Sequence, residues 1–413
     1  MQIVKIKDLG KIVTGKTPST KKPELFGDDY PFITPSDISS YNVYHIQNTE
    51  RRLSEKGYLS QKNKLLPPKT VCYVCIGSTI GKICLTKTPS FTNQQLNNII
   101  VDQLRYVPEY IYYRLRYETP RIQSIASGTG SGKAIYNKTA FEDYQLEIHE
   151  YLLQRKIASI LSTYDDLIEN NTRRIKILEE MAQLIYKEWF VNFRFPGHEK
   201  VKFVNSELGK IPERWKVISL GDICYIEKNK YKEPEHSTLP LLDLARIPRR
   251  SLVINSLGSS CELKTSRIIF RKGSVLFGSI RPYFHKVFYA FCDGVTNTSV
   301  FVIKAAEPAT VSFLLSLLFS EDSVNWANQN SGGTKMPVIS WDVFKTMKVI
   351  LPDKNLLSKY DTIVTSFLQE TCVLNLKNLK LKVTRDLLLP KLISGKLNVS
   401  YLDIDTRKQE NDT

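Results

Sequence analysis

The chain has 413 residues and carries 58 Lys and Arg residues against 42 Asp and Glu residues, a formal net charge of +16. Hydrophobic residues make up 42% and charged residues 24% of the sequence, which excludes a disordered chain and predicts about two or three domains with cores of their own. The excess of positive charge favours a polyanionic partner, above all nucleic acid, over a merely soluble basic protein.

The sequence argues against a membrane or secreted protein. No stretch approaches the roughly 20 apolar residues that cross a bilayer, and Met1–Gly10 has no signal-peptide core. Seven cysteines, an odd number that fits a reducing compartment, include Cys72, Cys75 and Cys84. Structural zinc sites usually need a second ligand pair, and none follows at usable spacing, so we interpret these cysteines as parts of a buried strand pattern and expect no metal. We therefore expect a cytoplasmic protein.

Residues 1–149 form the first mixed segment of the chain. Short β-rich runs such as Thr70–Ile76 and Asn98–Val101 are separated by Gly, Pro and Asn turns, and a helical piece is expected at Pro108–Tyr117. This pattern predicts a compact α+β domain with a β-rich core.

A long helix is predicted over residues 150–195. Its apolar positions alternate in steps of four and three, as they do in a coiled-coil seam, and Pro196 with Gly197 is expected to stop it. Asn171 lies in the middle of the seam, where a polar group can fix the register of two helices. The seam positions are Ile157, Leu161, Tyr164, Ile168, Asn171, Ile175, Leu178, Ala182, Ile185 and Trp189.

Residues 196–351 form a second mixed segment that repeats the first at offsets of 201 to 211 residues. It has β-rich runs at Arg267–Phe270, Ser274–Phe277 and Val300–Ile303 and a helical piece at Ala309–Phe319. The recurring landmarks are Leu9–Ile12 with Leu220–Ile223, Val71–Ser78 with Ser274–Ile280, Phe91–Gln94 with Val295–Thr298, Ser127–Lys133 with Asn330–Lys335, and His149-Glu150 with Pro352-Asp353. Several matches in one order indicate an internal duplication.

A second long helix is predicted over residues 352–399, with its end kinked or frayed at Pro390 and a flexible tail at 400–413. Its seam is weaker, since only seven of its ten positions are apolar. These positions are Tyr360, Val364, Phe367, Thr371, Leu374, Asn378, Leu381, Arg385, Leu388 and Leu392.

Each helix could instead pack against its own domain. However, each seam is a narrow stripe of the coiled-coil kind, and about 40 helical residues reach about 60 Å, further than a domain of this size. We therefore expect the two helices to pair antiparallel. The predicted architecture is two β-rich α/β domains separated by a long antiparallel two-helix coiled coil, with a pseudo-two-fold internal repeat.

Two similar basic domains on a stiff rod suit a split target on DNA, because the duplex has a two-fold symmetry of its own. The rod would fix the gap between half-sites, and the divergence between the two halves predicts two different half-sites. Base reading needs Arg or Lys for guanine and Asn or Gln for adenine. The candidates on polar loops are Lys16, Asn93, Gln94, Gln95, Lys133, Lys228, Asn229, Lys230, Arg246, Arg249, Arg250, Arg281, Asn297 and Lys335. For each one the alternative is a solvated surface residue or an Asn that shapes a turn.

Nearly the whole chain resembles the specificity (S) subunits of type I restriction-modification enzymes. The matching segments are Val4–Gly15 with Pro31–Ile38, Ile76–Lys82 with Thr92–Gln95, Gln154–Ile157 through Tyr186–Phe190, Gly209–Trp215, and Leu387–Gly395. The turn Gly278–Pro282 departs from the GxxGK turn of the first domain, which puts residue-by-residue transfer between the domains in doubt.

The resemblance implies two target recognition domains, each of which reads half of a bipartite DNA site, and two helical regions that dock methyltransferase (M) subunits, of which we expect two. It places S-adenosylmethionine in the M subunits, and ATP-driven translocation and cleavage, with ATP and Mg²⁺, in restriction (R) subunits. The S subunit itself is expected to hold no cofactor and to catalyse nothing.

A search for hidden chemistry agrees with a non-catalytic chain. Gly128–Lys133 mimics a phosphate-binding loop, but Ser127 and Ala134 stand where that loop needs Gly and Ser or Thr. Asp243 with Glu262 and Lys264 fits a nuclease metal triad only loosely, and no amino-methyltransferase tetrapeptide occurs. Two alternatives stay open: a DNA-modifying or DNA-cleaving enzyme with fused recognition domains, and a protein-binding scaffold.

Overall fold

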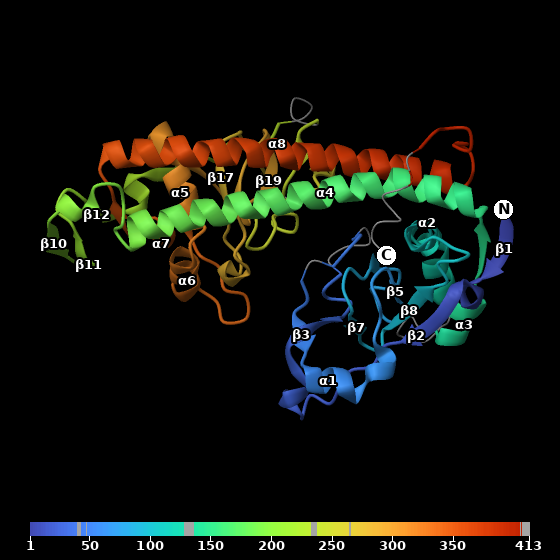
Figure 1. The fold of residues 1–413 in the computed structure, drawn as a ribbon. Coiled ribbons are helices and arrows are strands. Elements are labelled where there is room, and N and C mark those ends of the chain that lie inside the picture. Colours follow the sequence, from blue (N-terminus) through green and yellow to red (C-terminus); the bar gives the residue numbers. More distant parts are fainter. Residues whose placement is uncertain are drawn as a thin grey trace. The chain divides into compact units, whose positions relative to one another are not determined.

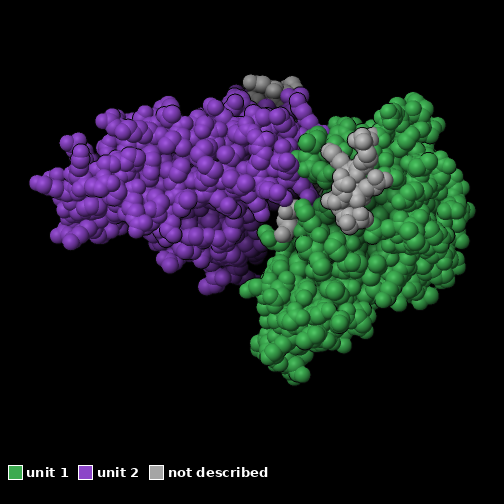
Figure 2. All heavy atoms as spheres, in the orientation of Figure 1, with its two compact units in different colours: residues 1–167, 381–413 green, residues 168–380 purple. Residues whose placement is uncertain are grey.

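The computed structural model describes residues 1–38, 43–46, 48–127, 136–232, 238–263, 266–404 and 406. The chain divides into two compact units, which Figure 2 colours separately. Unit 1 comprises Met1–Leu167 and Leu381–Thr413, and unit 2 comprises Ile168–Lys380. Each unit therefore combines one mixed segment with parts of both long helices, α4 (Tyr151–Tyr186) and α8 (Lys354–Ile393) (Figure 1).

Unit 1 has nine strands and three shorter helices among its described residues. They are β1 (Gln2–Lys5), β2 (Gly10–Thr14), β3 (Phe26–Ile33), β4 (Arg51–Leu53), β5 (Val71–Val74), β6 (Ile83–Leu85), β7 (Phe91–Thr92), β8 (Leu96–Val101), β9 (Gln145–Ile148), α1 (Glu55–Ser60), α2 (Pro108–Ser127) and α3 (Lys138–Asp143). The central sheet is antiparallel in the order β2-β8-β5-β6. A second sheet has the order β4-β3-β7, in which β3 and β7 are parallel, and β1 pairs with β9.

Unit 2 repeats this plan. Its elements are β10 (Phe203–Ser206), β11 (Gly209–Pro212), β12 (Lys216–Ser219), β13 (Cys224–Ile226), β14 (Pro240–Leu241), β15 (Gly258–Ser259), β16 (Arg267–Phe270), β17 (Val275–Gly278), β18 (Val287–Tyr289), β19 (Gly294–Asn297), β20 (Val300–Ala305), β21 (Lys348–Leu351), α5 (Val311–Leu318), α6 (Glu321–Gln329) and α7 (Trp341–Phe344). The sheets have the orders β13-β20-β17-β18 and β15-β14-β19-β16, β12 pairs with β21, and β10-β11 is a hairpin without a counterpart among the described strands of unit 1.

The strand registers prove the duplication and correct one detail of it. Val71 faces Ile99 in unit 1 and Val275 faces Ile303 in unit 2, so both partners shift by 204 residues. At this offset the counterpart of Gly77 is Arg281, not Gly278. The sequence-based match of the two Gly-Ser pairs was therefore wrong by three residues, because the paired strands fix the register and the turn in unit 2 does not use glycine.

Each unit has its own apolar core, and each core takes in one helix end. The core of unit 1 includes Leu389, Leu392 and Ile393 from the end of α8. The core of unit 2 includes Ala182 and Tyr186 from the end of α4. Deletion of either helix end would open an apolar core, so these segments are integral parts of the folded units.

Within each unit α4 and α8 run antiparallel. In unit 2, Asn171 donates to Asn378 at 2.9 Å and Arg174 pairs with Glu370, so rising numbers on α4 meet falling numbers on α8. In unit 1, Asp165 pairs with Arg385. Every expected seam position is buried or half-buried. The expected antiparallel pairing is thus confirmed, and the two seam asparagines, Asn171 and Asn378, are partners of one another.

The helix ends differ from expectation. The α-helix α4 ends at Tyr186 and passes into a π-helical turn at Lys187–Val191, so it stops before Pro196. Helix α8 continues through Pro390, where a kinked or frayed end was expected, and ends at Ile393, before position 399. The buried side chains of Leu392 and Ile393 hold this last turn in the core of unit 1.

Candidate nucleic-acid interface

The candidates of unit 1 gather where two chain segments meet. The backbone N–H of Lys16, just after β2, donates to Thr92 O at 3.0 Å, and the Thr17 hydroxyl donates to Gln94 Oε1 at 2.7 Å. Lys16 and Gln94 are exposed, and Gln95 is half-buried. Thus Lys16, Gln94 and Gln95 lie together on one surface, with a cation and two amides available for contacts.

Asn93 has a local structural role. Its side-chain oxygen accepts from the Gln95 N–H at 3.0 Å, its amide donates to Gln95 Oε1 at 3.0 Å, and the residue is buried. Asn297 occupies the equivalent turn of unit 2, and its side-chain oxygen accepts from the Ser299 N–H at 3.2 Å. Asn93 therefore shapes its turn with both ends of its amide, and Asn297 shapes the equivalent turn through its side-chain oxygen.

Several candidates of unit 2 are exposed. Lys228, Asn229 and Lys230 follow β13, and the carbonyl of Asn229 accepts from the Ile269 N–H at 2.8 Å. Lys335 is exposed in the Gly-rich segment between Gly332 and Val338, which bridge one another. Lys133, the candidate from the corresponding segment of the first half, lies outside the described residues.

The arginines of unit 2 fall into two groups. Arg246 binds both Asp243, at 3.0 Å, and Glu262, and Arg250 pairs with Glu321. These two arginines are already neutralised by carboxylates. The same contacts occupy the two acids that loosely fit a nuclease triad, whose Lys264 is outside the described part of the chain.

Arg249 and Arg281 form the second group, because neither has an acid partner among the described residues. The Arg249 guanidinium lies 3.9 Å from the centroid of the Phe284 ring and the Arg281 guanidinium 5.9 Å from it. Guanidinium groups over an aromatic face keep their outer N–H donors free. This pair is therefore a cationic group of unit 2 that is available to a polyanion.

Two equivalent lysines, which sequence reasoning did not single out, fasten the loops beside these clusters. Lys82 Nζ donates to Pro35 O at 2.9 Å in unit 1, and Lys286 Nζ donates to Leu244 O in unit 2. Burial lowers the pKa of both ammonium groups, with a further contribution from Arg249 at Lys286. Aligning the strands rather than the glycines of the two halves would have brought these lysines into register.

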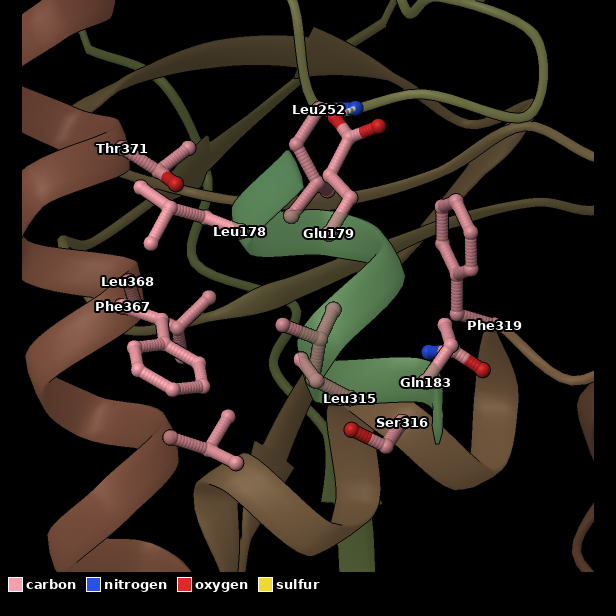
Figure 3. A pocket seen from close by; sticks show the side chains of 12 residues that line it. Leu178, Glu179, Gln183, Leu252, Leu315, Ser316, Phe319, Phe367, Leu368 and Thr371 are labelled. Atoms are coloured by element: carbon pink, nitrogen blue, oxygen red, sulfur yellow. Dashed lines mark hydrogen bonds between the residues drawn. The ribbon is translucent and has the colours of Figure 1, made fainter. Parts of the chain in front are cut away.

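A small cavity in unit 2 lies between α4, α8 and α5 (Figure 3). Its volume of about 20 Å³ suits little more than a water molecule, which excludes a small-molecule site. Glu179 on its wall accepts from the N–H of Leu252 and from Ser251 Oγ at 3.2 Å, and burial raises the pKa of Glu179 to about 7. Asn375 on α8 holds the same segment, because its amide donates to Leu252 O at 2.8 Å.

Comparison with known proteins identifies the family. Residues 1–180 and 212–370 match the family described as "Type I restriction modification DNA specificity domain". The chain belongs to this family. The resemblance to specificity subunits that the sequence motifs indicated is thus confirmed.

Relatives match nearly all of this specificity-family chain or a part of it. It is 27% identical over 412 residues to the type I restriction enzyme MjaIX specificity subunit of Methanocaldococcus jannaschii, covering 97% of this chain and 94% of that protein. It is 36% identical over 187 residues to the HindI specificity subunit of Haemophilus influenzae, covering 44% of this chain and 39% of that protein. The crystal structure of a type I restriction-modification S subunit from Mycoplasma genitalium shares the fold, with a TM-score of 0.58, 17% identity and 95% of both chains covered.

Among the described residues, no helix has the length and apolarity that crossing a membrane requires. The same residues contain no group of three or more His, Cys, Asp or Glu side chains arranged to hold a metal ion.

Proposed function

We propose that the chain reads an interrupted, asymmetric DNA site for a type I restriction-modification complex, with one half-site contacted by each unit. The observation that carries this proposal is a common scaffold with different surface side chains. Gly77 and Gln95 in unit 1 correspond to Arg281 and Ser299 in unit 2, on strands with the same register. Equal scaffolds that present different donors and acceptors favour two different half-sites.

The charge distribution supports DNA as the ligand. The chain carries a net charge of +16, and Lys16, Arg249 and Arg281 have no acid partner among the described residues. Each phosphate contact releases counterions, so affinity should fall steeply as salt rises. A protein-binding scaffold would show no sequence-selective response to DNA.

The helices offer a surface for the methyltransferase subunits. On α4 of unit 2, Ile177, Met181 and Leu184 are 48%, 42% and 60% exposed and share one helix face at intervals of four and three. Val373 and Leu376 are exposed on α8 of the same unit. We infer that an apolar face of a methyltransferase subunit covers these side chains, since exposed apolar stripes mark interaction sites.

In this proposal the chain is non-catalytic and cytoplasmic. The domains, helices and tail keep the boundaries 1–149, 150–195, 196–351, 352–399 and 400–413. S-adenosylmethionine belongs to the two M subunits, and ATP and Mg²⁺ belong to the R subunits. The paired helices α4 and α8, at about 1.5 Å per residue, would set the gap between half-sites. Methyl transfer by the purified chain alone would favour the rival, a modifying enzyme with fused recognition domains.

Methylome sequencing of a host strain with and without this gene tests the function. We expect the deletion to remove one asymmetric, interrupted adenine-methylation motif. Retention of every methylation motif would overturn the proposal. A gel-shift series on that motif, with the full chain and rising salt, separates a DNA reader from an adaptor.

A further inference from the structure

A turn follows β5 in the central sheet of unit 1, and an equivalent turn follows β17 in unit 2. Two residues of each turn have a left-handed backbone conformation. In unit 1 they are Gly77 and Gly81, with φ of 91° and 93°. In unit 2 they are Arg281 and His285, both with φ of 50°. Residues other than glycine adopt this conformation at a cost in backbone strain, and residues strained in this way cluster at functional sites. The sequence of unit 2 therefore keeps two large side chains where the backbone favours glycine.

His285 has a local reason for its place. Its ring is buried, and Nε2 lies 2.8 Å from the Phe319 carbonyl. Nδ1 lies 3.6 Å from the carboxylate of Glu321. The imidazole thus packs the start of α6 against the turn, a role that glycine could not fill.

In the described part of the chain, the Arg281 side chain makes a single contact of this kind, with its guanidinium 5.9 Å from the centroid of the Phe284 ring. Its backbone N–H donates to Pro337 O at 2.7 Å, which a glycine would do equally well. Its Nε–H is buried and finds no acceptor among the described residues. A buried atom is out of reach of a ligand, so a partner outside the chain would meet the outer Nη1 and Nη2 atoms of the guanidinium, which pair with no acid among the described residues.

The neighbouring turn changes in a complementary way. Gln95 in unit 1 and Ser299 in unit 2 are equivalent, because their carbonyls accept from Cys75 N–H at 2.8 Å and Ser279 N–H at 2.9 Å. Gln95 Nε2 lies 3.9 Å from the position of a Cβ on Gly77. In unit 1, Gly77 has no side chain and the neighbouring turn carries the long amide of Gln95. In unit 2, the neighbouring turn has only the short hydroxyl of Ser299, and Arg281 carries a long guanidinium. At each site one long polar side chain reaches the surface.

We propose that Arg281 determines specificity by reading a guanine in the half-site that unit 2 contacts. This inference rests on the proposed function. The planar fork of a guanidinium matches O6 and N7 of guanine in the major groove, a contact that an amide or hydroxyl does not reproduce. Arg249, whose guanidinium lies 3.9 Å from the centroid of the same Phe284 ring, supplies an adjacent cation for the phosphate backbone.

The test compares base preferences of the wild type with those of Arg281→Gly and Arg281→Lys. The full chain, in complex with its methyltransferase subunits, selects duplexes from a library randomised in both half-sites. We expect the wild type to require guanine at one position of one half-site, and Arg281→Gly to lose that preference by about tenfold or more while the other positions are unchanged. Arg281→Lys should retain part of it. Because Arg271 is exposed and already paired with Asp293 at 2.8 Å, Arg271→Ala is the matched control for lost charge.

Thermal unfolding separates this role from a structural one. Glycine adopts the left-handed conformation without strain. The melting temperature of the Arg281→Gly variant should therefore not fall below that of the wild type. An unchanged base preference in Arg281→Gly would overturn the inference, as would uniform weakening on all sequences with a salt slope reduced by about one, the signature of a phosphate contact. A wild type that selects no sequence at all would instead overturn the proposed function.

Discussion

Asp165 on α4 and Arg385 on α8 form an ion pair in the core of unit 1, with side chains only 3% and 1% exposed. Tyr113 on α2 donates its hydroxyl to the second oxygen of Asp165 at 2.5 Å. Asp386 accepts from Arg385 at 2.9 Å and from Arg116 at 2.5 Å. Burial raises the pKa of Asp165 in spite of these cations. Charges thus join α2 of the recognition domain to both long helices within unit 1.

Arg385→Met should be strongly destabilising, because it leaves the carboxylate of Asp165 buried without its counter-ion. We expect a loss of about 3–5 kcal/mol in the free energy of unfolding, measured by urea denaturation. Arg174→Met is the matched control, since its pair with Glu370 is exposed and should cost less than about 1 kcal/mol. Equal, small losses in the two variants would show that the buried network does not hold the helices.

Substitutions at two adjacent residues of α4 distinguish a role in folding from a role in docking the methyltransferase subunits. Leu178 lies in the seam and lines the small cavity of unit 2, whereas Ile177 is 48% exposed. Leu178→Asp should cost several kcal/mol of stability, because it buries a charge without a partner (about 3 kcal/mol or more). Ile177→Asp should change the stability by less than about 0.5 kcal/mol and yet weaken co-purification with the methyltransferase subunits. Unchanged stability of Leu178→Asp would contradict the seam, and unchanged co-purification of Ile177→Asp would contradict the docking face.

The sequence predicted the elements with strong periodicity and missed features that depend on tertiary contacts. Strand β16 at Arg267–Phe270 has the expected bounds, and α8 begins two residues after position 352. The fraying expected at Pro390 is absent, because the core of unit 1 holds the last turn of α8 although Pro390 disfavours a helix locally. At Pro390, packing in the core of unit 1 outweighs the local preference against a helix.

The candidate site was harder to predict, since exposure and partners decide which cations are free. Arg246 and Arg249 are equally polar loop residues in the sequence, but only Arg246 lies between two carboxylates. These carboxylates are 3 and 16 residues away along the chain, and the longer separation leaves no periodic signal. The shift by three residues in the repeat likewise hid the equivalence of Gly77 and Arg281.

Stability should depend on pH through Glu179. Burial raises the pKa of this carboxyl to about 7 in the folded protein, so the folded state binds more protons than the unfolded state between about pH 4.5 and 7. The free energy of unfolding should therefore fall as pH rises through this range, by about 1–3 kcal/mol. Glu179→Gln keeps an oxygen acceptor for Leu252 N–H and should flatten this part of the profile. An identical slope in wild type and Glu179→Gln would contradict the assignment.

Lys16 and Lys82 should respond differently to the same substitution. Lys82 Nζ donates to Pro35 O at 2.9 Å, so its charge serves a loop contact, whereas Lys16 is exposed beside Gln94. Lys82→Met should lower stability by about 1–2 kcal/mol and leave the salt dependence of DNA affinity unchanged, because no phosphate contact is lost. Lys16→Met should leave stability unchanged and reduce the salt slope by about one. Titration of one target duplex at several salt concentrations checks both variants, with the exposed Lys87→Met as the control for a charge outside the interface. A reduced slope in Lys82→Met would mean that the ammonium leaves Pro35 to bind phosphate when DNA is present.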